Sequence, residues 1–144
     1  MIFSDFLNLK IKDLMQKSVV TMTADFAVDD AVKTMVSYEI GSVVILDDKK
    51  NAVLGILTER DLMTRVMATH LDSKTTLIRN VMTKVPVALS PDLPVAQIFS
   101  LLKEKNIRHV PIVDRGKLVG IISIKDVFKM LHKIIGDVIF GAGE

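Results

Sequence analysis

Hydrophobic and polar positions in the first half of the chain follow two different periods. Apolar residues recur at helical spacing between Val28 and Val36. Two mainly apolar runs follow, residues 42–46 and 52–57, on either side of the polar residues 47–51, which is typical of a β-hairpin. A second stripe with helical spacing begins near Glu59. This order predicts a helix, a hairpin and another helix.

The second half of the chain repeats this order of elements. Apolar positions at helical spacing lie between Val95 and Leu102, and the runs 109–113 and 117–122 flank a short polar turn. The last helix is expected to begin near Lys125. Pro111 lies inside the first of these runs and has no amide proton, so it predicts an edge position or a missing ladder bond. The predicted order is βαββα, twice.

The two halves also match residue by residue. Residues 11–15 match residues 78–82 at an offset of 67 residues. After two extra residues within the polar turn 48–51, an offset of 65 residues aligns the segment 55–61 with the segment 120–126. A loop tolerates an insertion of this kind, so the chain contains two tandem copies of one unit.

A repeat of about 60 residues buries a small share of its surface when it folds alone. We therefore expect the two repeats to pack against each other about a pseudo-two-fold axis, giving an α/β (α+β) fold with two related clefts between them. Clefts of this kind are ordinary sites for small ligands. The predicted boundaries are an N-terminal segment 1–10, a first repeat 11–70, a linker 71–77, a second repeat 78–136 and a C-terminal tail 137–144.

Composition excludes several classes of site. Nineteen basic and seventeen acidic residues leave a formal net charge of +2, which argues against the dense basic face of a nucleic-acid-binding protein. The absence of cysteine excludes disulfides and thiolate metal sites, and the three histidines lack metal-ligand spacing, so no metal is expected. No signal-peptide pattern and no run of about twenty apolar residues is found, so no membrane association and a cytoplasmic location are expected.

The segments 55–61 and 120–126 carry the strongest local signal. Each reads glycine, two apolar residues, a hydroxyl residue, two variable residues and aspartate, at a predicted junction between a strand and a helix. Glycine permits close approach to the backbone, the hydroxyl and free helix-start amides can receive phosphate oxygens, and the carboxylate can accept ribose hydroxyls. The same hydroxyl and acid spacing also describes a capping box. The residues alone leave a ligand site and a purely structural cap both open.

Taken together, these features resemble a pair of CBS domains, the family named after cystathionine β-synthase, over about residues 11–135. The matching pieces are Met82-Thr83, the strand phrase 108–114 and the two glycine–hydroxyl–aspartate segments. In that family the pair forms the disc-like Bateman module. The resemblance implies a ligand such as AMP, ADP, ATP or S-adenosylmethionine, whose presence is reported to a partner domain or protein.

The resemblance also implies which residues form the two clefts. The first cleft would take Ile56, Thr58, Arg60, Asp61, Thr83, Val87, Arg108 and His109. The second would take Gln16, Val20, Gly41, Ser42, Ile121, Ser123, Lys125 and Asp126.

The two predicted clefts differ in charge. Arg60, Arg108 and His109 offer the first cleft several groups that suit phosphate, whereas Lys125 is the one obvious cation of the second. We therefore expect the first cleft to bind an anionic ligand more tightly. A structural alternative is that Arg108 and His109 are strand-end residues paired with nearby aspartates.

No pattern of nucleophile and base is found, so the chain is predicted not to be an enzyme and to need no cofactor. The predicted function is a regulatory, energy-sensing module that signals adenine-nucleotide binding to an unknown partner protein, or to the rest of a longer chain. Two alternatives stay open: a ligand-free dimerisation or interaction scaffold, and a nucleic-acid-binding CBS protein. A single tyrosine and no tryptophan disfavour the last of these. Apolar residues near both ends of the chain predict a homodimer that forms through helices.

Overall fold

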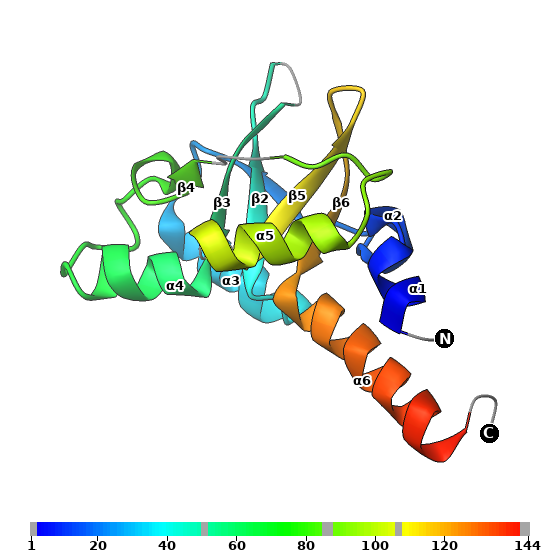
Figure 1. Ribbon diagram of the computed structural model, residues 1–144. Coiled ribbons are helices and arrows are strands. Elements are labelled where there is room, and N and C mark those ends of the chain that lie inside the picture. Colours follow the sequence, from blue (N-terminus) through cyan, green and yellow to red (C-terminus); the bar gives the residue numbers. More distant parts are fainter. Residues whose placement is uncertain (1–2, 50–51, 85–87, 106–107, 142–144) are drawn as a thin grey trace. The chain divides into compact units, whose positions relative to one another are not determined.

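The computed structural model describes residues 3–49, 52–84, 88–105 and 108–141. They fall into two units, which we call the central unit (Val19–Pro86 with Gly116–Leu118) and the terminal unit (Met1–Ser18, Val87–Arg115 and Val119–Glu144). Helices and sheets occur in both units, and the fold is the predicted mixed α/β arrangement of two repeats (Figure 1).

The central unit is built on a four-stranded sheet in the order β1-β2-β3-β4. Strand β1 pairs in parallel with β2, and the β2–β3 and β3–β4 pairs are antiparallel. The π-helical segment η1 continues directly from α4. The elements are β1 (Thr21–Thr23), α3 (Val28–Tyr38), β2 (Ser42–Leu46), β3 (Val53–Thr58), α4 (Glu59–Asp61), η1 (Leu62–Met67), the 3₁₀ helix η2 (Ile78–Asn80) and β4 (Thr83–Lys84).

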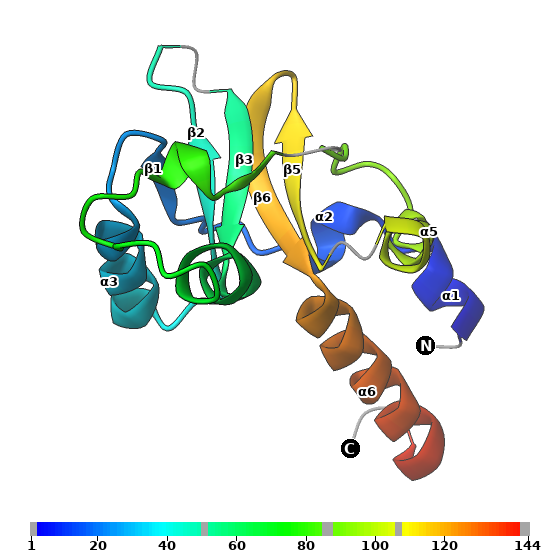
Figure 2. The ribbon, with the colours of Figure 1, turned by 90° about the vertical axis from the view of Figure 1, so that its left-hand side faces the viewer.

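The terminal unit contains a two-stranded sheet of β5 and β6, visible beside α6 in Figure 2. Isolated bridges extend this sheet on both sides, from Leu89 to Ile112 and from Gln16 to Ile121. The first strand of the second βαββα repeat is therefore reduced to a single bridge. The elements are α1 (Phe3–Asn8), α2 (Ile11–Leu14), α5 (Ala96–Lys105), β5 (His109–Asp114), β6 (Lys117–Ser123, whose first two residues are assigned to the central unit) and α6 (Ile124–Phe140).

Each unit has its own hydrophobic core, and each core includes the opening segment of the other repeat. Ile11 is fully buried among residues of the second repeat such as Val95 and Ile112, and its amide donates to Leu93 O at 2.8 Å. Ile78 is fully buried among residues of the first repeat, and its amide donates to Phe26 O at 2.9 Å. The folded units thus exchange the segments with which the sequence repeats begin.

Two helix ends differ from simple sequence expectations. The residue before α3 is Ala27, which has no side-chain cap, and the amides of Val28 and Asp29 donate to Thr76 O and Ser73 O at 2.9 and 2.8 Å. Backbone carbonyls of the predicted linker therefore accept hydrogen bonds from the first amides of this helix. Helix α6 continues through Phe140, into the segment 137–144 predicted to be a tail. Within the described part of the chain, no helix has both the length and the apolar character needed to cross a membrane.

Candidate functional site

Asp61, in the central unit, is a buried carboxylate with both oxygens engaged. It is 5% exposed and belongs to the turn where β3 passes into α4. Its Oδ2 accepts hydrogen bonds from the Thr58 amide at 3.0 Å and the Thr58 hydroxyl at 3.1 Å, while the Asp61 amide donates to Thr58 Oγ1 at 3.2 Å. Its Oδ1 accepts from the Thr83 hydroxyl at 2.9 Å. The capping box is thus present, and Thr83 holds the second oxygen.

Arg65 is a further polar residue of this cluster that the sequence did not single out. Its Nε lies 3.8 Å from Asp61 Oδ1, one helical turn away. Its Nη1 donates to the carbonyls of Val81 and Met82 at 3.2 and 2.9 Å. The guanidinium therefore balances the buried charge and ties η1 to the segment that leads into β4. The spacing of four residues from Asp61 was the signal that could have identified it.

Asp126, in the terminal unit, repeats this geometry at the start of α6. Its Oδ2 accepts from the Ser123 amide at 2.8 Å and the Ser123 hydroxyl at 3.0 Å, and its Oδ1 accepts from Gln16 Nε2 at 3.0 Å. Gln16 thus occupies the role that Thr83 has in the central unit. Met130 aligns with Arg65, so the second carboxylate lacks the corresponding guanidinium.

Another part of the chain passes close to the glycine of each repeated motif, Gly55 and Gly120. Ile56 pairs with Thr83, and Ile121 pairs with Gln16 in the same way. A Cβ added at Gly55 would lie 2.6 Å from Thr83 O, and one at Gly120 would lie 2.6 Å from Met15 Sδ and 2.9 Å from Gln16 O. The close approach expected at these glycines is therefore made by protein atoms.

Helix-start amides that were expected to be free for phosphate are engaged within each unit. The Glu59 amide donates to Gly41 O at 3.1 Å, and the Asp61 amide donates to the Thr58 hydroxyl. The equivalent bond in the terminal unit runs from the Ile124 amide to Arg108 O at 3.0 Å. Of the groups predicted to receive phosphate, these amides are therefore already engaged, whereas the Arg108 side chain is exposed.

The remaining predicted site residues divide between the units. The central unit brings together Ile56, Thr58, Arg60, Asp61 and Thr83, and it also holds Val20, Gly41 and Ser42. The terminal unit holds Gln16, Arg108, His109, Ile121, Ser123, Lys125 and Asp126. Val87 lies outside the described residues. The meeting of Asp61 with Arg108 and His109, and of Asp126 with Gly41 and Ser42, stays a prediction.

The predicted site residues differ in exposure. The side chains of Arg60, Arg108 and Lys125 are exposed, whereas Ile56 is buried and His109 is half-buried at the start of β5. Among the described residues, no group of three or more metal-ligating side chains is positioned to hold a metal ion.

The fold and site define a class of protein: a tandem α/β repeat in which each repeat places a capped aspartate at a strand–helix junction. The CBS domain family model matches residues 11–68 and 78–133. The chain therefore belongs to the CBS domain family.

Individual relatives agree with this assignment. A mitochondrial CBS domain-containing protein of Arabidopsis thaliana, CBSX3, is 31% identical over 110 residues, covering 74% of this chain and 53% of the relative. An uncharacterized protein of Methanopyrus kandleri is 32% identical over 125 residues, covering 85% of this chain and 63% of the relative. The chain thus spans between about half and two thirds of the length of these two curated relatives.

Solved structures share the fold. A CBS-domain containing protein of Agrobacterium tumefaciens is 35% identical, with a TM-score of 0.78, covering 85% of this chain and 99% of that one. A hexameric CBS-CP12 protein from bloom-forming cyanobacteria is 30% identical, with a TM-score of 0.77 and coverages of 83% and 69%. The CBS domain pair of the protein MJ0100, in complex with 5′-methylthioadenosine and S-adenosylmethionine, is 24% identical, with a TM-score of 0.77 and coverages of 87% and 97%.

Proposed function

We propose that this CBS pair is a non-catalytic regulatory module that binds an adenosine ligand (AMP, ADP, ATP or S-adenosylmethionine) and signals its presence to a partner protein. The observation that carries the proposal is the twofold occurrence of an oriented carboxylate at a strand–helix junction, at Asp61 and Asp126. In each, one oxygen is fixed by the capping box, while the other accepts a hydrogen bond from Thr83 or Gln16; at Asp61 the Arg65 Nε also lies 3.8 Å from that oxygen. A carboxylate oxygen has two lone pairs, so Oδ1 keeps acceptor capacity for a ribose hydroxyl.

The structures of other CBS proteins support the choice of ligand class. The domain pair of MJ0100 shares this fold and holds two adenosine derivatives. In the present chain, Arg60 and Arg108 add exposed guanidinium groups to the residues proposed for the first site, and arginine suits phosphate oxygens. We propose that the Asp61 site prefers phosphorylated ligands. The Asp126 site, with Gln16 and Lys125, is proposed to bind them more weakly.

A ligand-free interaction scaffold is the second candidate function. It is favoured by the capping boxes themselves, since Thr58–Asp61 and Ser123–Asp126 each perform a complete structural role without a ligand. A homodimer is part of both proposals. It is supported by exposed apolar side chains on the helices, such as Val36 and Phe128, which are 72% and 59% exposed.

Arg108→Gln is the substitution that best tests the proposed function. Asp61→Ala would also remove a cap from a buried position, whereas the Arg108 side chain is exposed and its backbone carbonyl, which bonds to Ile124, is retained. Calorimetric titration should show saturable AMP or ATP binding to the wild type, weakened about tenfold or more in Arg108→Gln, since a charge-assisted contact contributes roughly 1.5–3 kcal/mol.

Arg115→Gln is the matched control, because Arg115 is also an exposed arginine of the terminal unit but belongs to the β5–β6 turn. It should bind like the wild type. No heat with AMP, ATP or S-adenosylmethionine for correctly folded wild-type protein would favour the scaffold. Equal losses in both arginine variants would show a general charge effect and not a site.

A further inference from the structure

Helix α6 carries an apolar face that its own unit leaves uncovered. The helix runs from Ile124 to Phe140, whereas the matching helical segment of the first repeat ends at Met67 and the family match ends at residue 133. The extension beyond residue 133 runs away from strands β5 and β6 (Figures 1 and 2). Its exposed apolar residues are Ile135, Val138, Ile139 and Phe140, at 55%, 69%, 64% and 76%.

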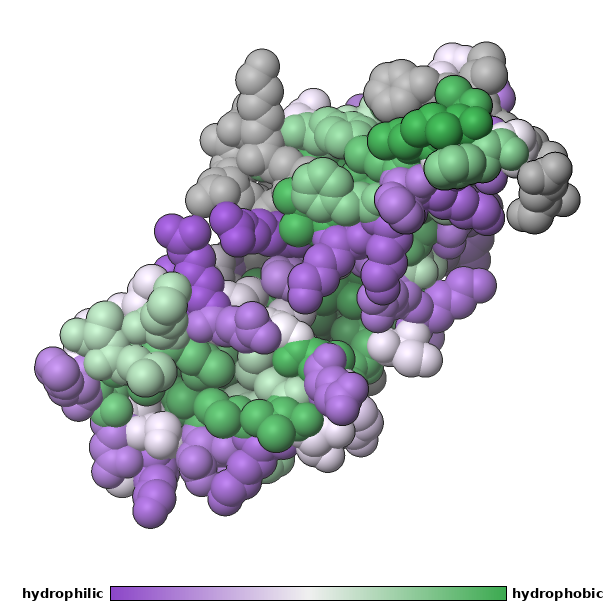
Figure 3. All heavy atoms as spheres, turned by 90° about the horizontal axis from the view of Figure 1, so that it is seen from below, coloured by the Kyte–Doolittle hydropathy of each residue, from purple (hydrophilic) through white to green (hydrophobic). Residues whose placement is uncertain are grey.

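A row of positive charge flanks this apolar face. Lys125, Lys129 and Lys133 follow one another at intervals of four residues, so they lie on one side of the helix, and all three are exposed. Of the acidic residues of α6, Asp126 is engaged in the cap with Ser123, and Asp137 is half-buried. Figure 3, which views the protein from below, shows hydrophobic side chains at the surface beside hydrophilic ones.

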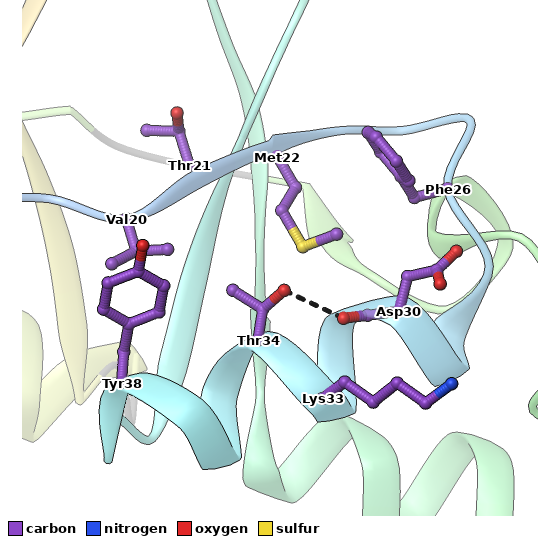
Figure 4. A pocket seen from close by; sticks show the side chains of 8 residues that line it. All are labelled: Val20, Thr21, Met22, Phe26, Asp30, Lys33, Thr34 and Tyr38. Atoms are coloured by element: carbon purple, nitrogen blue, oxygen red, sulfur yellow. Dashed lines mark hydrogen bonds between the residues drawn. The ribbon is translucent and has the colours of Figure 1, made fainter.

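The central unit has a groove between edge strand β1 and helix α3, with apolar walls and nearby aspartates that match the apolar face and the lysines of α6. Its volume is about 490 Å³. Met22 lines it from strand β1 and Val20 from the residue just before the strand, while Tyr38 lines it from helix α3 and Phe26 from the segment that leads into the helix (Figure 4). Phe26 and Tyr38 are 47% and 63% exposed, so large apolar surface is open to a partner. Within α3, the Thr34 hydroxyl donates a hydrogen bond to Asp30 O at 2.9 Å.

Acidic residues outnumber basic ones in the lining of the groove and of the pocket beside it. Asp30 lines the groove, and an adjoining pocket that also includes Met22 and Phe26 is lined by Asp47 and Asp48. The one lysine of the lining, Lys33, forms an ion pair with Asp29 at 3.0 Å, and this hydrogen bond raises the pKa of Lys33. Its charge is therefore already balanced within α3, and the aspartates leave an excess of negative charge.

We propose that the extension of α6 from a second copy of this chain lies in the β1–α3 groove, and that two copies exchange this contact reciprocally. The inference rests on the proposed homodimer and names its contact surface. Apolar residues at positions 135 and 139 are one helical turn apart and face the same way, which is how an amphipathic helix presents anchors to a groove. Lys129 and Lys133 then approach the aspartates at its border. A reciprocal contact forms twice in a twofold dimer, which doubles the buried apolar surface.

Site-specific cross-linking tests this contact directly, because the chain contains no native cysteine. Ile139→Cys and Tyr38→Cys proteins are mixed, allowed to exchange subunits and oxidised, so that a disulfide between the two variants reports a contact between copies. Both positions are highly exposed, at 64% and 63%, and tolerate substitution without loss of core packing. The control pairs Ile139→Cys with Met67→Cys, at an equally exposed apolar position of the same unit as the groove.

The expected result is a cross-linked dimer from the 139–38 pair and little from the 139–67 pair. If the cross-link does not form, the mass of the wild type from light scattering shows whether the groove contact alone or the homodimer itself is contradicted. A dimeric mass without the 139–38 cross-link would overturn the groove contact and leave the homodimer intact. A monomeric mass would overturn both. A monomer that binds anionic lipid vesicles through α6 would assign the apolar face to a membrane surface and also overturn the contact.

A charge exchange adds a second, independent readout. Lys133→Glu should raise the dimer dissociation constant by about tenfold or more at low salt, since it places like charges together. Adding Asp30→Lys to the same chain should restore most of the loss. Lys117→Glu, on an exposed lysine of β6, is the control and should leave dimerisation unchanged. Failure of Asp30→Lys to restore dimerisation would contradict the proposed pairing.

Discussion

At the scale of single residues, the two units hold equivalent aspartates in the same way but surround them with different side chains. Asp61 and Asp126 are held by the same capping bonds, but the second oxygen accepts from a threonine hydroxyl in one and from a glutamine amide in the other. Arg65 adds a guanidinium only beside Asp61. Because these substitutions change charge and donor type around equivalent carboxylates, the two halves are expected to differ in ligand preference.

The glycines of the repeated motif should be sensitive to a single methyl group. Gly55→Ala and Gly120→Ala each place a Cβ within 2.6 Å of a neighbouring atom, so each should lower the free energy of unfolding by about 1–3 kcal/mol. Gly136→Ala, in the middle of α6 with no atom near the added Cβ, should instead raise it by roughly 0.5–1 kcal/mol. Urea denaturation of the three variants measures the free energy of unfolding and so tests both the predicted decreases and the predicted increase. A neutral Gly55→Ala would show that the β3–β4 approach is looser than described.

At the scale of elements, hydrophobic periodicity predicted α3, α5, α6 and the two hairpins correctly, because a buried apolar stripe marks each helix and a run of consecutive buried residues marks strands β2, β3 and β5. The α3 stripe and the β2–β3 and β5–β6 hairpins all occur where the pattern predicts them. What the pattern could not supply is set by tertiary contact. The carbonyls of Thr76 and Ser73, which are remote in the sequence, accept hydrogen bonds from the first amides of α3. In the second repeat, Leu89 forms a single β-bridge at the position where the first repeat has strand β1.

The exchange of opening segments predicts that distant substitutions act on specific units. Ile11 and Ile78 are both fully buried, and either change to alanine should cost about 2–5 kcal/mol of stability. Ile11→Ala removes packing from the core of the terminal unit, so amides of α5 and α6 should lose more hydrogen-exchange protection than those of α3. Ile78→Ala should show the reverse order. If each variant instead lowered protection mainly in the repeat that contains the substituted residue, the proposed exchange of opening segments between the units would be contradicted.

At the scale of the whole molecule, the sequence supports the family and the location of the two aspartates, because duplicated motifs are visible without coordinates. The family resemblance grouped Thr83 with Asp61 and Gln16 with Asp126, but it could not supply the hydrogen bonds between them, since the residues of each pair lie 22 and 110 positions apart. Nor could periodicity show how far α6 extends or which surfaces it leaves exposed. Those features depend on packing between segments that are remote in the chain.

The central claim is that the capped aspartates form part of an adenosine-ligand site, and amide NMR during titration with AMP tests it most directly. The amides of Thr58 and Ser123 each donate to one of the two carboxylates, at 3.0 and 2.8 Å, so each reports on its own site. We predict saturable shifts of the Thr58 amide together with that of Arg108, described by one dissociation constant, and weaker shifts at Ser123. Unchanged Thr58, Ser123 and Arg108 signals with millimolar AMP, and likewise with ATP and S-adenosylmethionine, would contradict the account and leave both aspartates as structural caps.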